Sequence, residues 1–204
     1  PQYDAERKGY YLNDHIRPET SSHSLFKFDS KKSKEYLKAG FGVVNTHSHD
    51  GIMRGSGMLV SLNPNSNNAY RIIDDNSAQY LSFSKSVKSR QSYPTSRMGA
   101  MALLRQTYLD ATWYANGKMK NKDLSLDALN KNKNETQIFE TGNHVDALRA
   151  DKVGDEFGIQ YTIVGSGEEF ERIQDIKNTK EKLIIQINLR NANEVADPLL
   201  AKHT

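Results

Sequence analysis

The sequence predicts an α/β fold organised around a parallel β-sheet, and three observations support this prediction. Residues 137–170 show the order strand, helix, strand and glycine-rich turn into another helix, which is typical of a βαβα unit. The run FGVVNT is apolar and β-branched, as in a buried parallel strand. The last quarter repeats strand, helix and strand in IQYTIV, GEEFERIQDIK and KLIIQINL. We therefore expect four strands in one parallel sheet with right-handed crossovers, at 41–46, 137–140, 160–164 and 183–187.

Four further segments carry clear local signals. Residues 1–30 have Pro, Asn and Asp punctuation and little periodicity, so we expect an extended arm with one short turn. SKKSKEYLKAG predicts a helix that ends at Gly40. MLVSL, AYRII and AQYLSFS alternate between turns and predict a small antiparallel insertion. Thr95 or Ser96 caps the longest predicted helix, 97–116, and the helix places most of its apolar residues on one face: Met98, Met101, Ala102, Leu104, Tyr108, Leu109 and Trp113.

The composition excludes several classes of protein. The chain has no cysteine, which rules out disulfides, cysteine-ligated zinc and thiol nucleophiles. No apolar run approaches the ~20 residues that span a bilayer, so we expect no membrane insertion. The net charge of +3 comes from 28 basic and 25 acidic residues, a narrow surplus. Much of it lies beside one predicted loop, which we interpret as a solvated loop and not as a nucleic-acid site: Lys118, Lys120, Lys122, Lys131 and Lys133.

Length and hydropathy predict a single domain over 1–204 that belongs to a larger protein. The chain has 204 residues, begins at Pro1, contains 36% hydrophobic residues and has a mean hydropathy of −0.74. Such values are low for a self-sufficient α/β domain, and residues 31–204 would form its βα units. We expect an excised piece whose main partner is the missing remainder of its own polypeptide, with self-association as a further possibility. Its cellular location stays open, with export or the periplasm slightly favoured over the cytoplasm.

A His-X-His motif is the first candidate for chemistry. The segment Thr46-His47-Ser48-His49-Asp50-Gly51 follows the predicted strand 41–46. In extended backbone, residues i and i+2 point to the same side, so both imidazoles could chelate one metal ion. A lone motif of this kind is a weak signal. The alternative is a pair of loop histidines that are exposed or hydrogen-bonded locally.

Two further segments offer polar groups near predicted helix starts. Gly165-Ser166-Gly167 precedes a helix and could bind an anion through its backbone N–H groups, although Glu168 and Glu169 disfavour this. A plain turn with acidic residues at the helix start is the alternative interpretation of that sequence. Arg97 could contact a substrate carboxylate, or it could take part in a helix cap or a salt bridge.

Three segments together resemble the amidohydrolase superfamily, specifically its imidazolonepropionase-like branch. These are AGFGVVNTH (39–47), YPTSRMGAMALLRQ (93–106) and the βαβα unit at 137–170. The resemblance covers roughly residues 39 to 189 and implies part of a (β/α)8 TIM-barrel-like domain, since a complete barrel needs about 250 residues. It also implies metal-dependent hydrolysis of C–N bonds in amides or cyclic amides. In such enzymes a metal-bound hydroxide attacks a carbonyl, a carboxylate acts as general base, and the metal is most often zinc or iron.

The same resemblance also implies that the metal site is damaged. The family places metal-binding histidines at the ends of two strands where this sequence has Glu140 and Gly165, and a further His144 is displaced two residues downstream. Glu140 can still ligate a metal through oxygen, whereas Gly165 has no side chain and is a degenerate ligand position. The alternative is that Glu140 is a satisfied polar group at a strand end and that His144 lies in the first turn of a helix. The family's own His-X-His follows its first strand, but His47 and His49 follow a segment that resembles the second.

From these features the sequence predicts a segment without a complete metal centre. The candidate metal ligands are His47, His49, Glu140 and His144, and we expect fewer than three of them to meet. We accordingly expect no tightly bound metal and no hydrolysis by this chain alone. The alternative is a catalytically degenerate barrel module that acts as a scaffold or binding domain.

Overall fold

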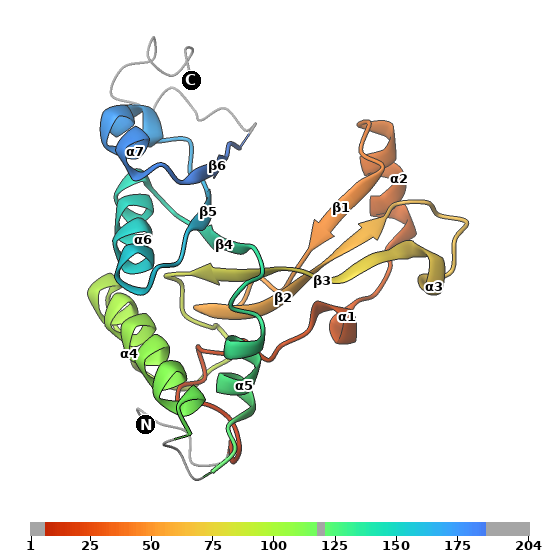
Figure 1. Ribbon diagram of the computed structural model, residues 1–204. Coiled ribbons are helices and arrows are strands. Elements are labelled where there is room, and N and C mark those ends of the chain that lie inside the picture. The colour runs from red at the N-terminus through yellow and green to blue at the C-terminus, as the bar shows by residue number, and fades with distance from the viewer. Residues whose placement is uncertain (1–6, 118–120, 187–204) are drawn as a thin grey trace.

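The computed structural model describes residues 7–117 and 121–186, and these form one curled six-stranded sheet flanked by helices (Figure 1). The strands occur in sheet order β1-β2-β3-β4-β5-β6. Their bounds are β1 (Val43–Thr46), β2 (Met53–Ser61), β3 (Ile72–Ser82), β4 (Gln137–Glu140), β5 (Tyr161–Val164) and β6 (Lys182–Ile184). The β1–β2 and β2–β3 pairs are antiparallel, whereas β3 to β6 run parallel to their neighbours. The sheet is therefore mixed, and it resembles part of an α/β barrel.

The parallel half agrees closely with the sequence-based prediction. β4 has the predicted bounds, and β5 begins one residue later than predicted. The predicted strand 183–187 is shorter, at Lys182–Ile184, and its last residue lies outside the described residues. Helix α6 (His144–Phe157) joins β4 to β5 and ends at Gly158, which has φ 66°. This left-handed conformation strongly favours glycine, so the helix ends there.

The antiparallel half corrects two predictions. The predicted strand 41–46 is shortened to β1, a half-exposed strand at the edge of the described sheet, where it pairs with the antiparallel β2. The three short strands predicted as an insertion are instead two long strands of the main sheet, with helix α3 (Asn68–Arg71) between them. The last residues of β3 pair in parallel with β4, from Gln79↔Gln137 to Ser82↔Glu140. Strand β3 continues through the polar, turn-like residues 74–77 that separate two of the predicted short strands, which alternation within short windows could not show.

The N-terminal arm is also more structured than predicted. His15 and Ile16 are buried, and the His15 carbonyl accepts hydrogen bonds from Ile52 N (2.8 Å) and Met53 N (3.1 Å). Isolated bridges join Ile16 to Met53 and Ser21 to Ser56, and a short helix α1 (Ser22–Leu25) follows. The arm therefore packs along β2 as part of the fold. Residues 1–6 of the predicted arm lie outside the described residues.

The helices show why local capping signals are informative. Helix α2 (Ser30–Lys38) is followed by Ala39 and Gly40, as predicted. Helix α4 (Arg97–Ala115) follows its N-cap Ser96, whose Oγ accepts a hydrogen bond from Gly99 N. The prediction of one apolar face on α4 was wrong in part, because four of its residues are exposed: Met98, Ala102, Leu109 and Trp113. Helix α5 (Leu124–Lys131), which begins after the capping residue Asp123, was not predicted.

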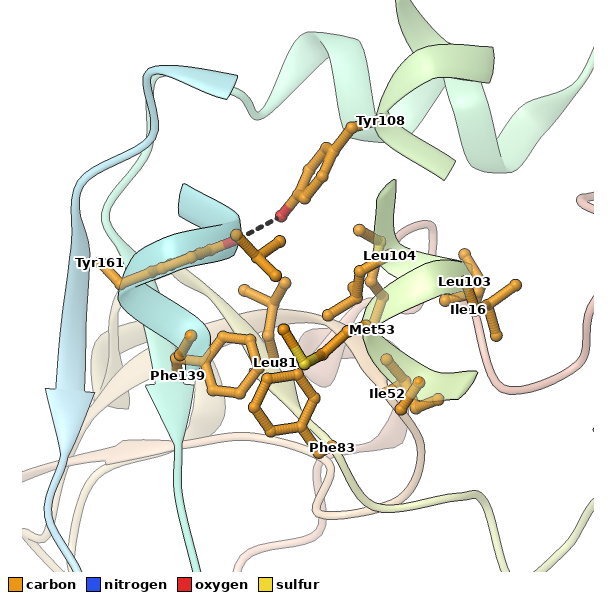
Figure 2. Close-up of a cluster of buried hydrophobic side chains, with 14 of the residues drawn as sticks. Ile16, Ile52, Met53, Leu81, Phe83, Leu103, Leu104, Tyr108, Phe139 and Tyr161 are labelled. Atoms are coloured by element: carbon orange, nitrogen blue, oxygen red, sulfur yellow. Dashed lines mark hydrogen bonds between the residues drawn. The ribbon is translucent and has the colours of Figure 1, made fainter. Parts of the chain in front are cut away.

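The main core lies between the parallel strands and helices α4 and α6 (Figure 2). Phe139 on β4 contacts Phe83 and Tyr161 with ring centroids 4.7 and 5.2 Å apart. The hydroxyl groups of Tyr108 and Tyr161 form a buried 2.8 Å hydrogen bond, so neither polar group is left unpaired in the core. Each fully buried large side chain stabilises the fold by roughly 1.5–3 kcal/mol. Ile16, Ile52 and Met53 extend this core to the arm and β2.

The remaining elements lie at the β6 edge of the sheet. A 3-10 turn η1 (Glu169–Arg172) and helix α7 (Ile173–Thr179) connect β5 to β6. Strand β6 exposes Leu183 and Ile184, and Ile185 beyond it is exposed as well. Self-association through this edge stays a prediction.

Lys122, Lys131 and Lys133 are exposed, whereas Lys118 and Lys120 lie outside the described residues. Among the described residues, no helix is both long and apolar enough to cross a membrane.

Candidate metal centre

Two distant segments of the chain bring three metal-ligating side chains together. His47 and His49 follow the last residue of β1, and Glu140 is the last residue of β4. One ligand atom from each residue lies within 4.8 Å of those of the other two. Glu140 Oε1 is 3.1 Å from His47 Nε2 and 3.5 Å from His49 Nδ1. The sequence indicated that the histidines need not meet Glu140, yet in the fold they do.

His47 is held in place from several directions. Its ring stacks on Tyr80 of β3, with centroids 3.5 Å apart and planes 8° apart. Its Nδ1 is 2.9 Å from the carbonyl oxygen of Ser48, and its side chain is 7% exposed. Gly57 on β2 leaves space for this stack, because a Cβ atom there would lie 2.5 Å from the Tyr80 ring. Little freedom therefore remains for the His47 ring to turn away from Glu140.

The hydrogen bonds of His47 suit a metal ligand. The Ser48 carbonyl can only accept, so His47 Nδ1 carries a hydrogen and donates it. The opposite ring nitrogen, Nε2, faces a carboxylate, which also has no hydrogen to donate when ionised. A lone pair on Nε2 therefore needs either a proton or a cation between it and Glu140. A ligating histidine whose other nitrogen donates to a backbone carbonyl is a common arrangement around protein-bound metals.

His49 is the exposed member of the cluster. Its side chain is 73% exposed, and its ring centroid lies 4.1 Å from that of His47. Partial removal from water and the nearby His47 keep the pKa of His49 below its ordinary value, although Glu140 opposes this shift. A lowered pKa favours the neutral imidazole, which is the form that binds metals. Asp50, next in sequence, anchors this loop by accepting hydrogen bonds from Ser86 Oγ (2.6 Å) and Val87 N (2.8 Å).

Arg54 contacts the same carboxylate from the other side. Its Nη1 donates a hydrogen bond to Glu140 Oε2, and its Nε donates to the Gly51 carbonyl at 3.1 Å. Burial alone would raise the pKa of Glu140. Hydrogen bonds from His47 and Arg54 and the charge of Arg54 outweigh that effect and lower this pKa to about 2. Glu140 is therefore ionised at neutral pH.

A cavity of about 140 Å³ adjoins the cluster at the ends of β3 and β4. It is lined by Arg54, Ser82, Phe83, Ser84, Arg97, Glu140, Thr141, Gly142 and Asp146. A cavity of this size can hold a group of roughly benzene size. A wider cleft of about 440 Å³ shares Phe83, Ser84 and Arg97 with it and continues to the start of α4.

Arg97 lies on the wall of both spaces, where the sequence suggested a substrate contact. Its Nε is 3.3 Å from a carboxylate oxygen of Asp146, which is almost fully buried. Asp146 also accepts a 3.0 Å hydrogen bond from Arg149. The salt-bridge alternative for Arg97 is therefore present in the fold, and a role toward substrate stays a prediction.

The two remaining candidate positions lie outside the cluster. His144 is the first residue of α6, and its Nδ1 lies 3.7 Å from carboxylate oxygens of Glu168 and Glu171. The space beside Gly165 is filled by Glu169, since a Cβ atom on Gly165 would lie 3.0 to 3.1 Å from its carboxylate. Glu169 accepts hydrogen bonds from Ser166 N (2.7 Å) and Gly167 N (2.9 Å). These backbone groups serve a carboxylate of the chain itself, which favours the plain-turn interpretation of this segment.

Sequence reasoning missed two residues of the site, Arg54 and Tyr80. Arg54 had a detectable signal, because a charged residue stands inside the otherwise small and apolar run GIMRGSGMLV. Buried charges are almost always paired, so this arginine needed a carboxylate partner. Tyr80 had no such signal, because an aromatic residue in a strand is common.

Comparison with known proteins gives one informative likeness. No protein-family model and no curated protein matches this sequence. A solved structure of an amidohydrolase from Thermotoga maritima MSB8 superposes with a TM-score of 0.69 at 19% sequence identity. The chain has an amidohydrolase-type fold. The likeness covers 91% of this chain and 54% of that one, so the chain spans about half the length of its structural neighbour. At this identity the likeness speaks for the fold and not for a particular branch or activity.

Proposed function

We propose that this chain contributes part of the active site of a metal-dependent hydrolase that cleaves C–N bonds in amides or cyclic amides. One observation carries the proposal: His47, His49 and Glu140 converge within 4.8 Å of one another. Three protein ligands and one open position are usual for catalytic zinc. The sequence led us to expect fewer than three converging ligands, and this geometry is the reason for preferring a metal site.

The donor set fits a divalent metal of intermediate softness. Two imidazole nitrogens and one carboxylate oxygen suit zinc or iron better than calcium or magnesium, which prefer oxygen ligands. His47 Nδ1 donates to a backbone carbonyl, which fixes the ring and leaves Nε2 for the metal. When bound, such a metal supplies Lewis acidity toward a substrate carbonyl.

The adjoining cavity supports a small substrate. It reaches from Glu140 to Arg97, so a group held there would lie beside the cluster. Arg97 is positioned to orient a polar end of the substrate. Asp146 is the other carboxylate on the wall, and its two oxygens are paired with Arg97 and Arg149. An imidazolonepropionase-like specificity is the narrower form of this proposal, and the PTSRMG segment at 94–99 supports it.

A second candidate is a catalytically degenerate barrel module that serves as a scaffold or binding domain. Two features favour it: Gly165 supplies no ligand, and Arg54 already gives Glu140 a cationic partner. In this case any metal bound by the chain would be adventitious.

Metal binding by tag-free protein separates the two candidates. After removal of metals with a chelator, the protein is titrated with Zn²⁺ by calorimetry. The hydrolase proposal expects one site that is lost in His47→Ala/His49→Ala and kept in His144→Ala, since His144 lies outside the cluster. Loss of binding in His144→Ala instead, or no binding in the wild type, would favour the degenerate module. Release of product from a panel of cyclic amides by the zinc-loaded protein then tests the activity.

A further inference from the structure

Arg54 stands between the two segments that carry the proposed ligands. It is the second residue of β2, and its side chain is 6% exposed. Its guanidinium donates to the Gly51 carbonyl beside the His-X-His loop and to Glu140 at the end of β4. An arginine side chain stays protonated at every pH that proteins tolerate. Glu140 therefore has a permanent cation on Oε2 while Oε1 faces His47 and His49.

This arrangement leaves the cluster without net negative charge before any metal arrives. The single negative charge of Glu140 is already matched by the single positive charge of Arg54, and the imidazoles carry no negative charge. A divalent cation entering the cluster would share one carboxylate with a like charge. The site therefore lacks the net negative charge that draws metals into most carboxylate-containing sites.

Two opposite effects of Arg54 on metal affinity can be compared by size. Hydrogen bonds that orient metal ligands are typically worth about 10- to 100-fold in affinity. A unit charge about 6 Å from a dication weakens binding about tenfold at the dielectric constant of water, and about ten-thousandfold at an effective value of about 20. Arg54 and His47 are both more than nine-tenths buried, which favours the lower dielectric value. Repulsion therefore outweighs orientation.

We propose that Arg54 is an internal cation that competes with the metal for Glu140 and keeps the metal affinity of this site low. The inference rests on the proposed metal site at His47, His49 and Glu140. It predicts a metal that exchanges readily and is lost on dialysis. It also reconciles three converging ligands with the weak retention of metal that the sequence suggested.

Two substitutions separate the charge of Arg54 from its hydrogen bond. Arg54→Gln removes the charge and retains an amide donor, whereas Arg54→Lys retains the charge and loses the guanidinium fork. Zn²⁺ dissociation constants are measured by competition with a chromophoric chelator at fixed pH and ionic strength. We expect Arg54→Gln to bind Zn²⁺ at least tenfold more tightly than the wild type, and Arg54→Lys to stay within about threefold.

The controls locate the effect and guard against misfolding. Arg105→Gln breaks an arginine–carboxylate pair with Glu156 on the surface and should leave Zn²⁺ affinity unchanged. His47→Ala combined with Arg54→Gln should abolish the gain in affinity. Circular dichroism confirms folding, and Arg54→Met serves as a second charge-free variant if Arg54→Gln does not fold.

Three other outcomes would contradict the proposal, each in a different way. Weaker binding in Arg54→Gln and Arg54→Met would overturn the inference and make Arg54 a positioning residue for Glu140, with the metal site intact. Equal affinities in the Gln and Lys variants would overturn it as well, because charge would then have no role. If Zn²⁺ binds neither to the wild type nor to Arg54→Gln nor to Arg54→Met, the metal site itself is overturned.

Discussion

The antiparallel half of the sheet, β1 to β3, and the parallel half, β3 to β6, are built by different means. In the parallel half, α6 leads from β4 to β5, and η1 with α7 leads from β5 to β6, so that each strand lies beside the one before it. The antiparallel half is held by close backbone approaches between segments far apart in sequence, such as Gly55 against Thr20. The candidate site lies where the two halves meet, with histidines from one and Glu140 from the other. The difference teaches that the reactive geometry depends on the pairing of β3 with β4, the strands that join the two halves.

The first prediction concerns the core of the parallel half and carries the largest expected effect. Phe139 is fully buried and packs on Phe83 and Tyr161. Phe139→Ala should lower the free energy of unfolding by roughly 3–5 kcal/mol, because a large cavity would remain between sheet and helices. Urea unfolding followed by circular dichroism measures the change. A loss below about 1 kcal/mol would show that the parallel half does not carry the main core.

The second prediction tests the close approaches of the antiparallel half. Gly55 has φ 84°, and a Cβ atom there would lie 2.0 Å from the Thr20 carbonyl oxygen. Gly55→Ala combines an unfavourable backbone conformation with overpacking and should destabilise the protein by roughly 2–4 kcal/mol. The same urea unfolding experiment measures this loss.

Gly158 in the parallel half is the matched control. It also has positive φ, at 66°, but a Cβ atom added there would have no other atom within 4 Å. Gly158→Ala should therefore cost only about 1 kcal/mol, the backbone contribution alone. Similar losses of unfolding free energy in Gly55→Ala and Gly158→Ala would mean that the contact between the arm and β2 contributes little to stability.

The third prediction concerns a helix cap, a contact between residues that are close in sequence. Ser96 caps α4 by accepting a hydrogen bond from Gly99 N at 3.1 Å. Ser96→Ala should cost about 1 kcal/mol, because a backbone donor in the first turn loses its partner. Ser96→Asp should restore most of this stability in thermal unfolding, since aspartate is an equally good cap. A loss that aspartate does not restore would point to a different role for Ser96.

The fourth prediction concerns pH and has the smallest expected effect. Burial, together with Asp151 and Asp155, raises the pKa of Glu181 from 4.5 to about 6. A carboxyl with a raised folded-state pKa stabilises the fold below its unfolded pKa, and this contribution is lost as pH rises through the folded value. Stability should therefore fall slightly between pH 4.5 and pH 6 on account of this group. Glu181→Gln should reduce that slope in denaturant titrations, and an unchanged slope would contradict the assignment.

The sequence predicted the parallel half well because its signals are local. Ser96 and Asn143 cap helices within three residues, and Gly158 ends one within the same turn. The apolar strands QIFE and YTIV stand between such helix boundaries, so their positions follow from their neighbours. Helix α5 was missed because its short apolar pattern stands among lysines and asparagines that resemble a loop.

The candidate site was only partly predictable. His47, His49 and Glu140 were each recognisable as possible ligands from their residue types and their places after strands. Their convergence depends on the pairing of β3 with β4, in which Ser82 aligns with Glu140, and on the pairing of β1 with β2. Alternation and composition contain no information about which strands become neighbours. The contact of Arg54 with Glu140, 86 residues apart, was invisible for the same reason.

By itself, the amino-acid sequence determined the α/β class, the boundaries of the βαβ unit from β4 to β5, the absence of cysteine chemistry and the loss of a side chain at Gly165. These follow from residue types and from contacts within a few positions. Only the tertiary structure decided that β1 is an antiparallel edge strand, that the arm packs along β2, and that two histidines, one carboxylate and one arginine share a site. Those outcomes depend on long-range strand pairing, whose energy comes from burying the whole sheet and not from any single segment.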